Sequence, residues 1–131
     1  MKIKTSELTG RALDWAVALA IGGAANKDNT EVQAPNRDYY LLSNGKGNFT
    51  PSTDWSQCGE LMDKYCKSFG MVQRRANKTW RAFAYGTPRN GQDTMRLASG
   101  DTLQIAFCRA LVAARLGDEI DIPDELVEDE G

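Results

Sequence analysis

The chain has 131 residues, of which 41% are hydrophobic and 26% are charged. This length suits one domain, and the composition excludes a chain that is disordered throughout. The sequence contains no histidine, which excludes Ser-His-Asp and Cys-His catalytic arrangements.

The first predicted helix runs from about Leu8 to Ala20, because apolar residues recur there at helical spacing. Thr5 or Ser6 is expected to cap its first amides, and Gly22-Gly23 is expected to end it. The polar stretch 24–36 then predicts a loop of about a dozen residues, which is long for a compact domain.

Residues 38–42 predict a short strand, followed by a flexible turn over 43–48. A second helix follows, for which Ser52, Thr53 and Asp54 are all suitable caps. We expect Gly70 to end this helix. Its predicted apolar stripe consists of Cys58, Leu61, Met62, Tyr65, Cys66 and Phe69.

Residues 71–75 and 79–85 predict two antiparallel strands, because the second run alternates in polarity and the connection has hairpin length. A polar loop over 86–93 precedes a further strand over 94–98. Asp101 is then expected to cap a third helix that Gly117 ends.

The segment after Gly117 carries eight acidic residues and no basic one. Its apolar residues predict that the first half docks on the domain, while the last residues stay loose. We therefore expect one domain over 1–122 and a loose acidic C-terminal tail over 123–131. The residues expected to dock are Ile120, Ile122, Leu126 and Val127.

The order of these elements favours an α+β fold, with a small antiparallel or mixed sheet of about four strands and three helices. Neither 39–42 nor 80–85 leaves an obviously wet face. This pattern favours helices on both sides of the sheet.

Three stretches carry a family resemblance: residues 5–18 (TSELTGRALDWAVA), 49–55 (FTPSTDW) and 115–126 (RLGDEIDIPDEL). Together they resemble the NinX-like family of small phage and prophage proteins. The resemblance implies an accessory role, the host bacterial cytoplasm and an α/β/α sandwich, but no mechanism. The chain departs from the usual family pattern at 24–36 and 86–99.

No catalytic residue, metal or cofactor is expected. The three cysteines suit a reducing cytosol, and they lack the paired spacing of a zinc site. Asp54, Asp93 and Asp101 could surround magnesium, but helix capping explains two of them better. The apolar run over 15–25 is too short to span a membrane, so no membrane partner is expected.

The motif around Ser52 and Thr53 has two interpretations. A helix start offers amides and partial positive charge that suit an anion. A structural start signal is favoured, because Asp54 would repel an anion and already supplies the cap. Trp15, Trp55 and Trp80 are likewise interpreted as core residues.

Charge is unevenly distributed along the chain. The formal net charge is −2, yet residues 1–115 hold all 16 basic residues against 10 acidic ones. Eight basic residues fall within 64–96, interleaved with aromatic ones, which is typical of a nucleic-acid surface but also of a solvated edge. The candidate nucleic-acid-binding residues are Arg74, Arg75, Lys78, Trp80 and Arg81.

Three functions are open. The first is a non-enzymatic phage accessory protein that acts as a binding or interaction module. The second is a nucleic-acid-binding protein that uses the basic 64–96 region and is gated by the acidic tail. The third is binding of a host protein by the tail, which deletion of 118–131 should abolish without unfolding the helices. A homodimer through an edge at 38–42 is a further alternative.

Overall fold

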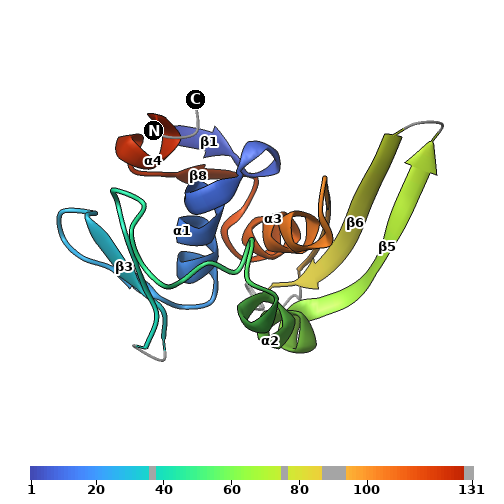
Figure 1. The fold of residues 1–131 in the computed structure, drawn as a ribbon, viewed down its shortest axis with the longest axis horizontal. Helices are drawn as coiled ribbons and strands as arrows, with labels where there is room; N and C mark the ends of the chain where they lie inside the picture. Colours follow the sequence, from blue (N-terminus) through green and yellow to red (C-terminus); the bar gives the residue numbers. More distant parts are fainter. Residues whose placement is uncertain (36–37, 75–76, 87–93, 129–131) are drawn as a thin grey trace.

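The computed structural model of the chain describes residues 1–35, 38–74, 77–86 and 94–128, with the backbone alone at 73–74, 77 and 128. The described residues form four α-helices and three small antiparallel sheets (Figure 1). The helices are α1 (Gly10–Ala20), α2 (Trp55–Tyr65), α3 (Leu103–Leu116) and α4 (Asp124–Glu128). One sheet pairs β1 (Lys2–Lys4) with β8 (Glu119–Asp121); the second contains β2 (Ala24–Ala25), β3 (Glu31–Gln33) and β4 (Tyr40–Leu42); the third contains β5 (Cys66–Arg74), β6 (Asn77–Tyr85) and β7 (Met95–Gly100).

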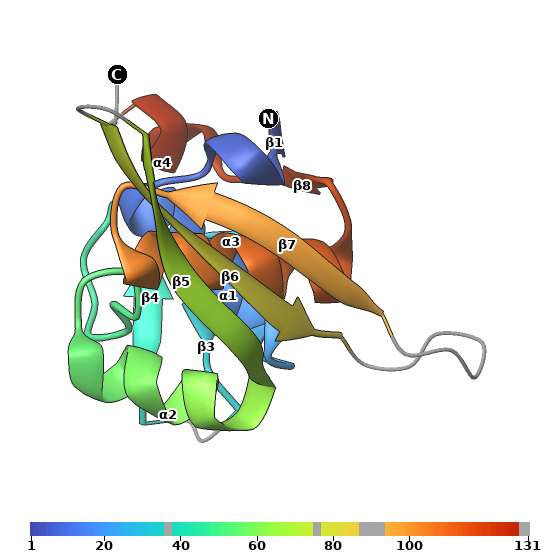
Figure 2. The same cartoon turned by 90° about the vertical axis from the view of Figure 1, so that its right-hand side faces the viewer.

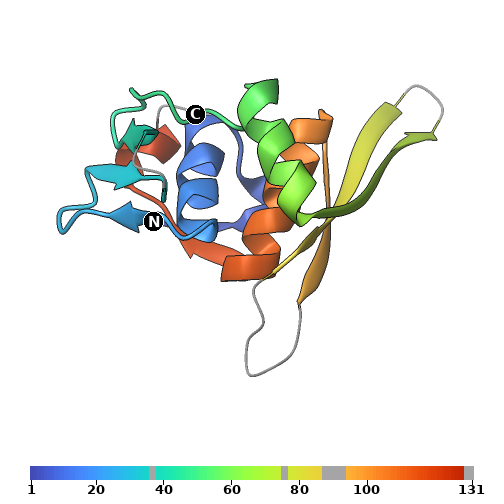
Figure 3. The same cartoon turned by 90° about the horizontal axis from the view of Figure 1, so that it is seen from below.

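The helices α1 and α3 form the centre of the molecule. They pack on each other, with β2 and β3 beside α1, and β6 and β7 beside α3 (Figure 3). Residues 12–18 of α1 are all buried, and a helix that is buried all round belongs in the interior. The α+β class is confirmed, but three small sheets surround a helical centre instead of one sheet lying between helices.

The start of α1 differs from the prediction and its end agrees with it. Thr9 precedes the helix without a side-chain capping bond, whereas the Thr5 hydroxyl donates to the Gly117 carbonyl at 2.8 Å. Gly22 has a φ of 97°, and the Gly23 amide donates back to the Ala18 carbonyl at 2.8 Å. This left-handed turn is a Schellman end, which the glycine pair predicts.

The polar stretch predicted as a loop over 24–36 contains the β2–β3 hairpin. The Asn26 side-chain oxygen accepts from the amides of Thr30 at 2.8 Å and Glu31 at 3.2 Å, and Asn29 has a φ of 54°. Asparagine supports such turns by bonding its own backbone and by tolerating a left-handed conformation. Val32 on β3 is fully buried, which anchors the hairpin to the core.

The predicted strand at 38–42 is present as β4. Its outer edge meets the returning chain, because the Leu42 amide donates to Lys46 at 2.7 Å and the Phe49 amide donates to Tyr40 at 3.0 Å. This edge is therefore covered from within the chain, which removes the basis for a homodimer through it.

The start of α2 is confirmed and its end is not. The Asp54 carboxylate accepts from the amides of Ser56 and Gln57, so Asp54 is the cap. The helix ends at Tyr65 and passes directly into β5, because Cys66 already has an extended backbone. Phe69, predicted on the apolar helix stripe, lies on this strand and is 57% exposed.

The β5–β6–β7 sheet contains the predicted hairpin and the predicted further strand. Trp80 on β6 pairs with Gly100 on β7, and Phe83 pairs with Leu97. The sequence places the cap of α3 one residue early, since the Thr102 hydroxyl, not Asp101, accepts from the Ile105 amide.

The acidic segment is built into the domain. β8 pairs with β1, and α4 forms within the part predicted as a loose tail from 123. Ile122 is 1% exposed and Leu126 is fully buried, so apolar burial holds this segment in place. The last residues, 129–131, lie outside the described residues.

Candidate functional site

The structure describes three of the five predicted nucleic-acid-binding residues with their side chains. Lys78, Trp80 and Arg81 all lie on β6, while Arg75 and the side chain of Arg74 lie outside what the structure describes. Side chains alternate between the two faces of a strand, so Trp80 and Arg81 project to opposite sides. Trp80 packs against the core, and Lys78 and Arg81 are exposed. The hairpin thus presents cations without stacking Trp80 beside Arg81.

The face of the β5–β6–β7 sheet that carries Arg81 is turned away from α3. Figure 2 shows this sheet toward the viewer with α3 behind it, and no described helix lies in front of it. Phe83 and Leu97 are directly paired on it, as are Tyr85 and Met95. The open face is defined by Val72, Arg81, Phe83, Tyr85, Met95 and Leu97.

The open face is apolar at its centre. Leu97 and Met95 are each 47% exposed, and a shallow hollow of about 280 Å³ lies between β5 and β7. Cross-strand pairs of large apolar side chains are ordinarily covered by another layer. Here the described residues supply that layer on one face of the sheet only.

The strands that form the open face carry charge of a single sign. The three strands carry five basic residues and no acidic one. The Lys67 ammonium lies 4.8 Å from the centre of the Tyr85 ring, a cation–π contact that holds one of these charges over the sheet. A partner on this face would therefore meet an apolar centre with basic surroundings.

A second feature, the basic pocket, adjoins the open face at the edge of β7. It has a volume of about 500 Å³ and lies between β7, α3 and the segments around β1 and β8. Four cationic and two acidic side chains line it: Lys4, Arg81, Arg96, Arg109, Asp118 and Glu119.

Arg109 is the fixed point of the basic pocket. Its Nε donates to the Leu8 carbonyl at 2.8 Å and one Nη donates to the Ser99 carbonyl at 2.9 Å. Burial lowers the pKa of the Arg109 guanidinium, although the charge of Asp101 opposes this shift. No carboxylate lies within ion-pair distance of Arg109 among the described residues. The half-buried cation therefore has carbonyl partners but no counter-charge in contact.

The acidic segment approaches the basic pocket at one point. Arg96 Nε lies 4.0 Å from a carboxylate oxygen of Asp118, and the two side chains are 49% and 84% exposed. This long, exposed ion pair is weak.

The residues around the start of α2 have structural partners. Ser52 is 4% exposed, and its amide donates to a carboxylate oxygen of the buried Asp14 at 2.9 Å. Since Asp54 takes the next two free amides, the structural interpretation of this motif is supported over an anion site. Trp15 is in the core as predicted, whereas Trp55 is 57% exposed and is not.

The proposed magnesium set finds no support in the described residues. Asp54 caps α2, Asp101 precedes α3, and Asp93 lies outside the described residues. Over residues 1–35, 38–74, 77–86 and 94–128, no three acidic, cysteine or histidine side chains gather closely enough to hold a metal ion. Within the same ranges, no helix has the length and apolar character needed to cross a membrane.

Lys4 and Arg109 are the pocket residues that the sequence does not single out. They come from opposite ends of the chain, and Arg109 bonds a carbonyl 101 residues away. A signal for Arg109 exists, because it is a lone cation within the apolar run 103–114 of α3. A cationic side chain on an otherwise apolar helix needs polar partners when the helix is buried.

A family model described as bacteriophage P22 NinX matches residues 4–115. The match covers all four cations of the basic pocket and the whole open face, while Asp118, Glu119 and α4 follow it. No curated protein matches the chain.

Proposed function

Since the chain belongs to the bacteriophage P22 NinX family and is a phage accessory protein, we propose that it is a non-enzymatic binding module whose partner docks on the open face. The observation that carries this proposal is the uncovered pairing of Phe83 with Leu97 and of Tyr85 with Met95. Large apolar side chains gathered on one exposed face mark interaction sites.

The partner is a protein that is apolar at the centre of its contact and acidic at the rim. Apolar burial against Leu97 and Met95 would supply most of the affinity, because buried apolar anchors dominate interface energies. The five basic residues of the sheet would steer and orient an acidic rim. The host bacterial cytoplasm is the proposed setting.

Affinity capture tests this proposal, with lysate of phage-infected bacteria as the source and the chain as bait. Leu97→Asp and Met95→Asp place a carboxylate at exposed positions of the open face, so neither should unfold the sheet. Each should weaken binding of a captured partner by about 2 kcal/mol, as for a truncated interface anchor.

Trp55→Asp is the matched control, because Trp55 is also a large exposed hydrophobic side chain, and it lies on α2, outside the sheet. It should leave capture unchanged. Loss of the partner with Trp55→Asp but not with Leu97→Asp would refute the proposed interface.

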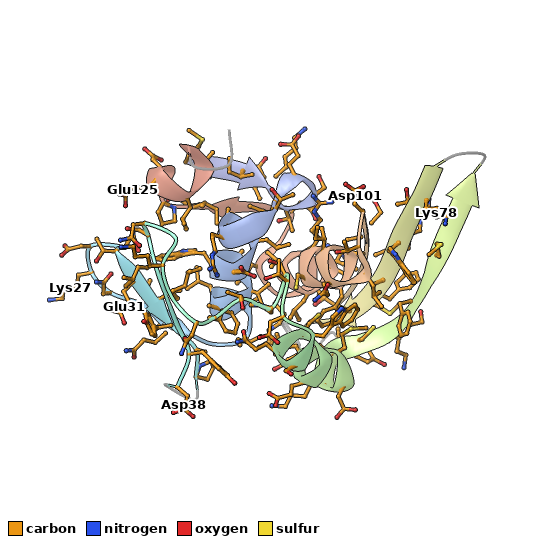
Figure 4. The ribbon with its side chains drawn as sticks, in the orientation of Figure 1. Lys27, Glu31, Asp38, Lys78, Asp101 and Glu125 are labelled. Carbon is orange, nitrogen blue, oxygen red and sulfur yellow. The ribbon has the colours of Figure 1, made fainter. Side chains whose placement is uncertain are left out.

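The second candidate is nucleic-acid binding, favoured by the exposed cations of β6. Lys78 lies on the projecting hairpin, on the opposite side of the molecule from Lys27 (Figure 4). Fluorescence polarisation with labelled single-stranded and duplex DNA and RNA, at low and physiological salt, separates this candidate from the first. Lys78→Ala and Arg81→Ala should each reduce the salt slope by about 1, and Lys27→Ala should not.

A further inference from the structure

We propose that the basic pocket binds a phosphate group, carried by a mononucleotide or by a single-stranded nucleic acid. This inference does not rest on a protein partner at the open face, because its anchor, Arg109, lies on α3 and not on the sheet.

The first argument is that, within the described residues, two cations of the pocket have no carboxylate in contact with them. Arg109 is held in place by two carbonyls, and in the described part of the chain neither Arg109 nor Arg81 has a carboxylate within ion-pair distance. Burial of a guanidinium without a counter-charge in contact costs free energy, and a bound anion reduces this cost. Because both carbonyls are backbone groups, the orientation of Arg109 is set before a ligand arrives.

The second argument is the match in charge and geometry. Four cationic and two acidic side chains leave a surplus of two positive charges, and a phosphate monoester carries about −1.5 to −2 at neutral pH. Arginine forks suit the several oxygens of phosphate, and three of the four cations are arginines. Ser99 also lines the cavity, and a serine hydroxyl can donate to a phosphate oxygen.

The third argument is size. A cavity of about 500 Å³ lies within the usual range for small-ligand sites, and it is larger than a bare phosphate requires. The pocket opens beside Leu97, which is 47% exposed and belongs to the open face. A base attached to the phosphate therefore has an adjacent apolar surface on which to lie.

An anion that enters the pocket must compete with the carboxylate of Asp118 for Arg96. This carboxylate is 4.0 Å from Arg96 Nε and is exposed, so an incoming phosphate would displace it at little cost. Removing the negative charge of Asp118 should therefore tighten binding.

The test is isothermal titration of the intact chain with inorganic phosphate, thymidine 5′-monophosphate and a short oligothymidylate at low salt. Lys4→Gln and Arg96→Gln each remove one exposed pocket cation, and Asp118→Asn removes the competing carboxylate. Lys78→Gln is the matched control, because Lys78 is an exposed cation on β6 that does not line the pocket. Thermal melts of all variants establish that each is folded.

We expect saturable binding that Arg96→Gln and Lys4→Gln each weaken about tenfold, as for loss of one charge-assisted hydrogen bond. Asp118→Asn should tighten it a few-fold, and Lys78→Gln should leave it unchanged. Binding of the mononucleotide identifies a free nucleotide as the source of the phosphate, and binding of the oligothymidylate alone identifies a nucleic-acid backbone.

Two results would overturn the proposal. One is the absence of saturable binding of all three ligands by the intact chain. The other is equal weakening by Lys78→Gln and Arg96→Gln, which would mean diffuse attraction to the basic hairpin, as in the nucleic-acid candidate above.

Discussion

Asp14 links α1 to the start of α2 through a buried carboxylate. It is 1% exposed, accepts the Ser52 amide at 2.9 Å and lies 3.8 Å from a guanidinium nitrogen of Arg11. A carboxylate on a helix is ordinarily a surface charge. Asp14 is buried instead because α1 is surrounded on all sides, so no position over 12–18 faces solvent.

Asp14→Ala should lower the free energy of unfolding by about 3 kcal/mol, because it leaves the Ser52 amide without its acceptor and removes the carboxylate beside Arg11. Asp14→Asn should cost roughly 1 kcal/mol, since the amide oxygen can still accept from Ser52. Urea unfolding at neutral pH measures both. Asp63→Ala, on the exposed side of α2, is the control and should change stability by less than about 0.5 kcal/mol. Equal losses of unfolding free energy in Asp14→Ala and Asp14→Asn would show that the side-chain oxygen accepting from Ser52 does not account for the effect.

At the scale of elements, two glycines in or beside helices have opposite roles. A Cβ at Gly23 would collide with the backbone carbonyls of Ala18 and Gln33, where the end of α1 meets β3. A Cβ at Gly59, within α2, would meet nothing within 4 Å.

Gly23→Ala should therefore destabilise the chain by more than about 1 kcal/mol, because neither carbonyl can move without disturbing α1 or β3. Gly59→Ala should stabilise it by about 0.5–1 kcal/mol, because alanine favours the helix interior. Thermal or urea unfolding of the two variants gives the two signs. The same sign for both would contradict the close approach at Gly23.

The β1–β8 pair makes stability depend on pH. The Met1 amine donates to Asp121 at 2.8 Å and to Asp124 at 3.1 Å; the hydrogen bond with Asp121 is the main cause that raises the pKa of the amine, and it also lowers the pKa of Asp121. Because the pKa of the amine is raised in the folded chain, the charged amine stabilises the fold fully below its ordinary pKa. This contribution is lost as the pH rises through the pKa of the folded state. Because the pKa of the Asp121 carboxyl is lowered in the folded chain, the carboxylate stabilises the fold fully above its ordinary pKa. This contribution is lost as the pH falls through the pKa of the folded state.

The intact chain should thus lose a small increment of stability between neutral and alkaline pH that an Asp121→Asn, Asp124→Asn double variant does not lose. The increment is small because these groups are exposed. Urea midpoints of both proteins across the pH range isolate it from other titrations. An identical alkaline decline in the two proteins would exclude this ion pair as its source.

Short sequence motifs correctly predict where several helices and strands begin or end. The turn at Gly22, the cap at Asp54 and the hairpin between β5 and β6 follow from short-range chemistry that a sequence displays. The passage of α2 directly into β5 does not, because the apolar residues up to Phe69 fit a helical period equally well. These residues form a strand because they pair with β6, and this pairing overrides their helical pattern.

At the scale of the whole molecule, contacts between the two ends of the chain escape prediction. β1 pairs with β8, and Arg109 reaches a carbonyl of the N-terminal segment. Such pairings depend on packing of the complete domain and leave no local pattern. For this reason the basic residues of β6 are found from the sequence, whereas the pocket formed with Lys4 and Arg109 is not.

The acidic segment shows the same dependence, because it completes the core. A chain that ends at Gly117 loses β8 together with Ile122 and Leu126, which are 1% and 0% exposed. Burial of each is worth about 1.5–3 kcal/mol, so the truncated chain should lose about 3–6 kcal/mol, a large part of the stability of an ordinary domain. A loss of this size would make unfolding hard to separate from loss of a partner of the acidic segment, whereas the sequence alone predicts that the helices survive the deletion. Asp118→Asn combined with Glu119→Gln removes charge but keeps both apolar anchors, and it should unfold at the same urea concentration as the intact chain. A truncated chain that melts like the intact one would show that Ile122 and Leu126 do not hold the domain together.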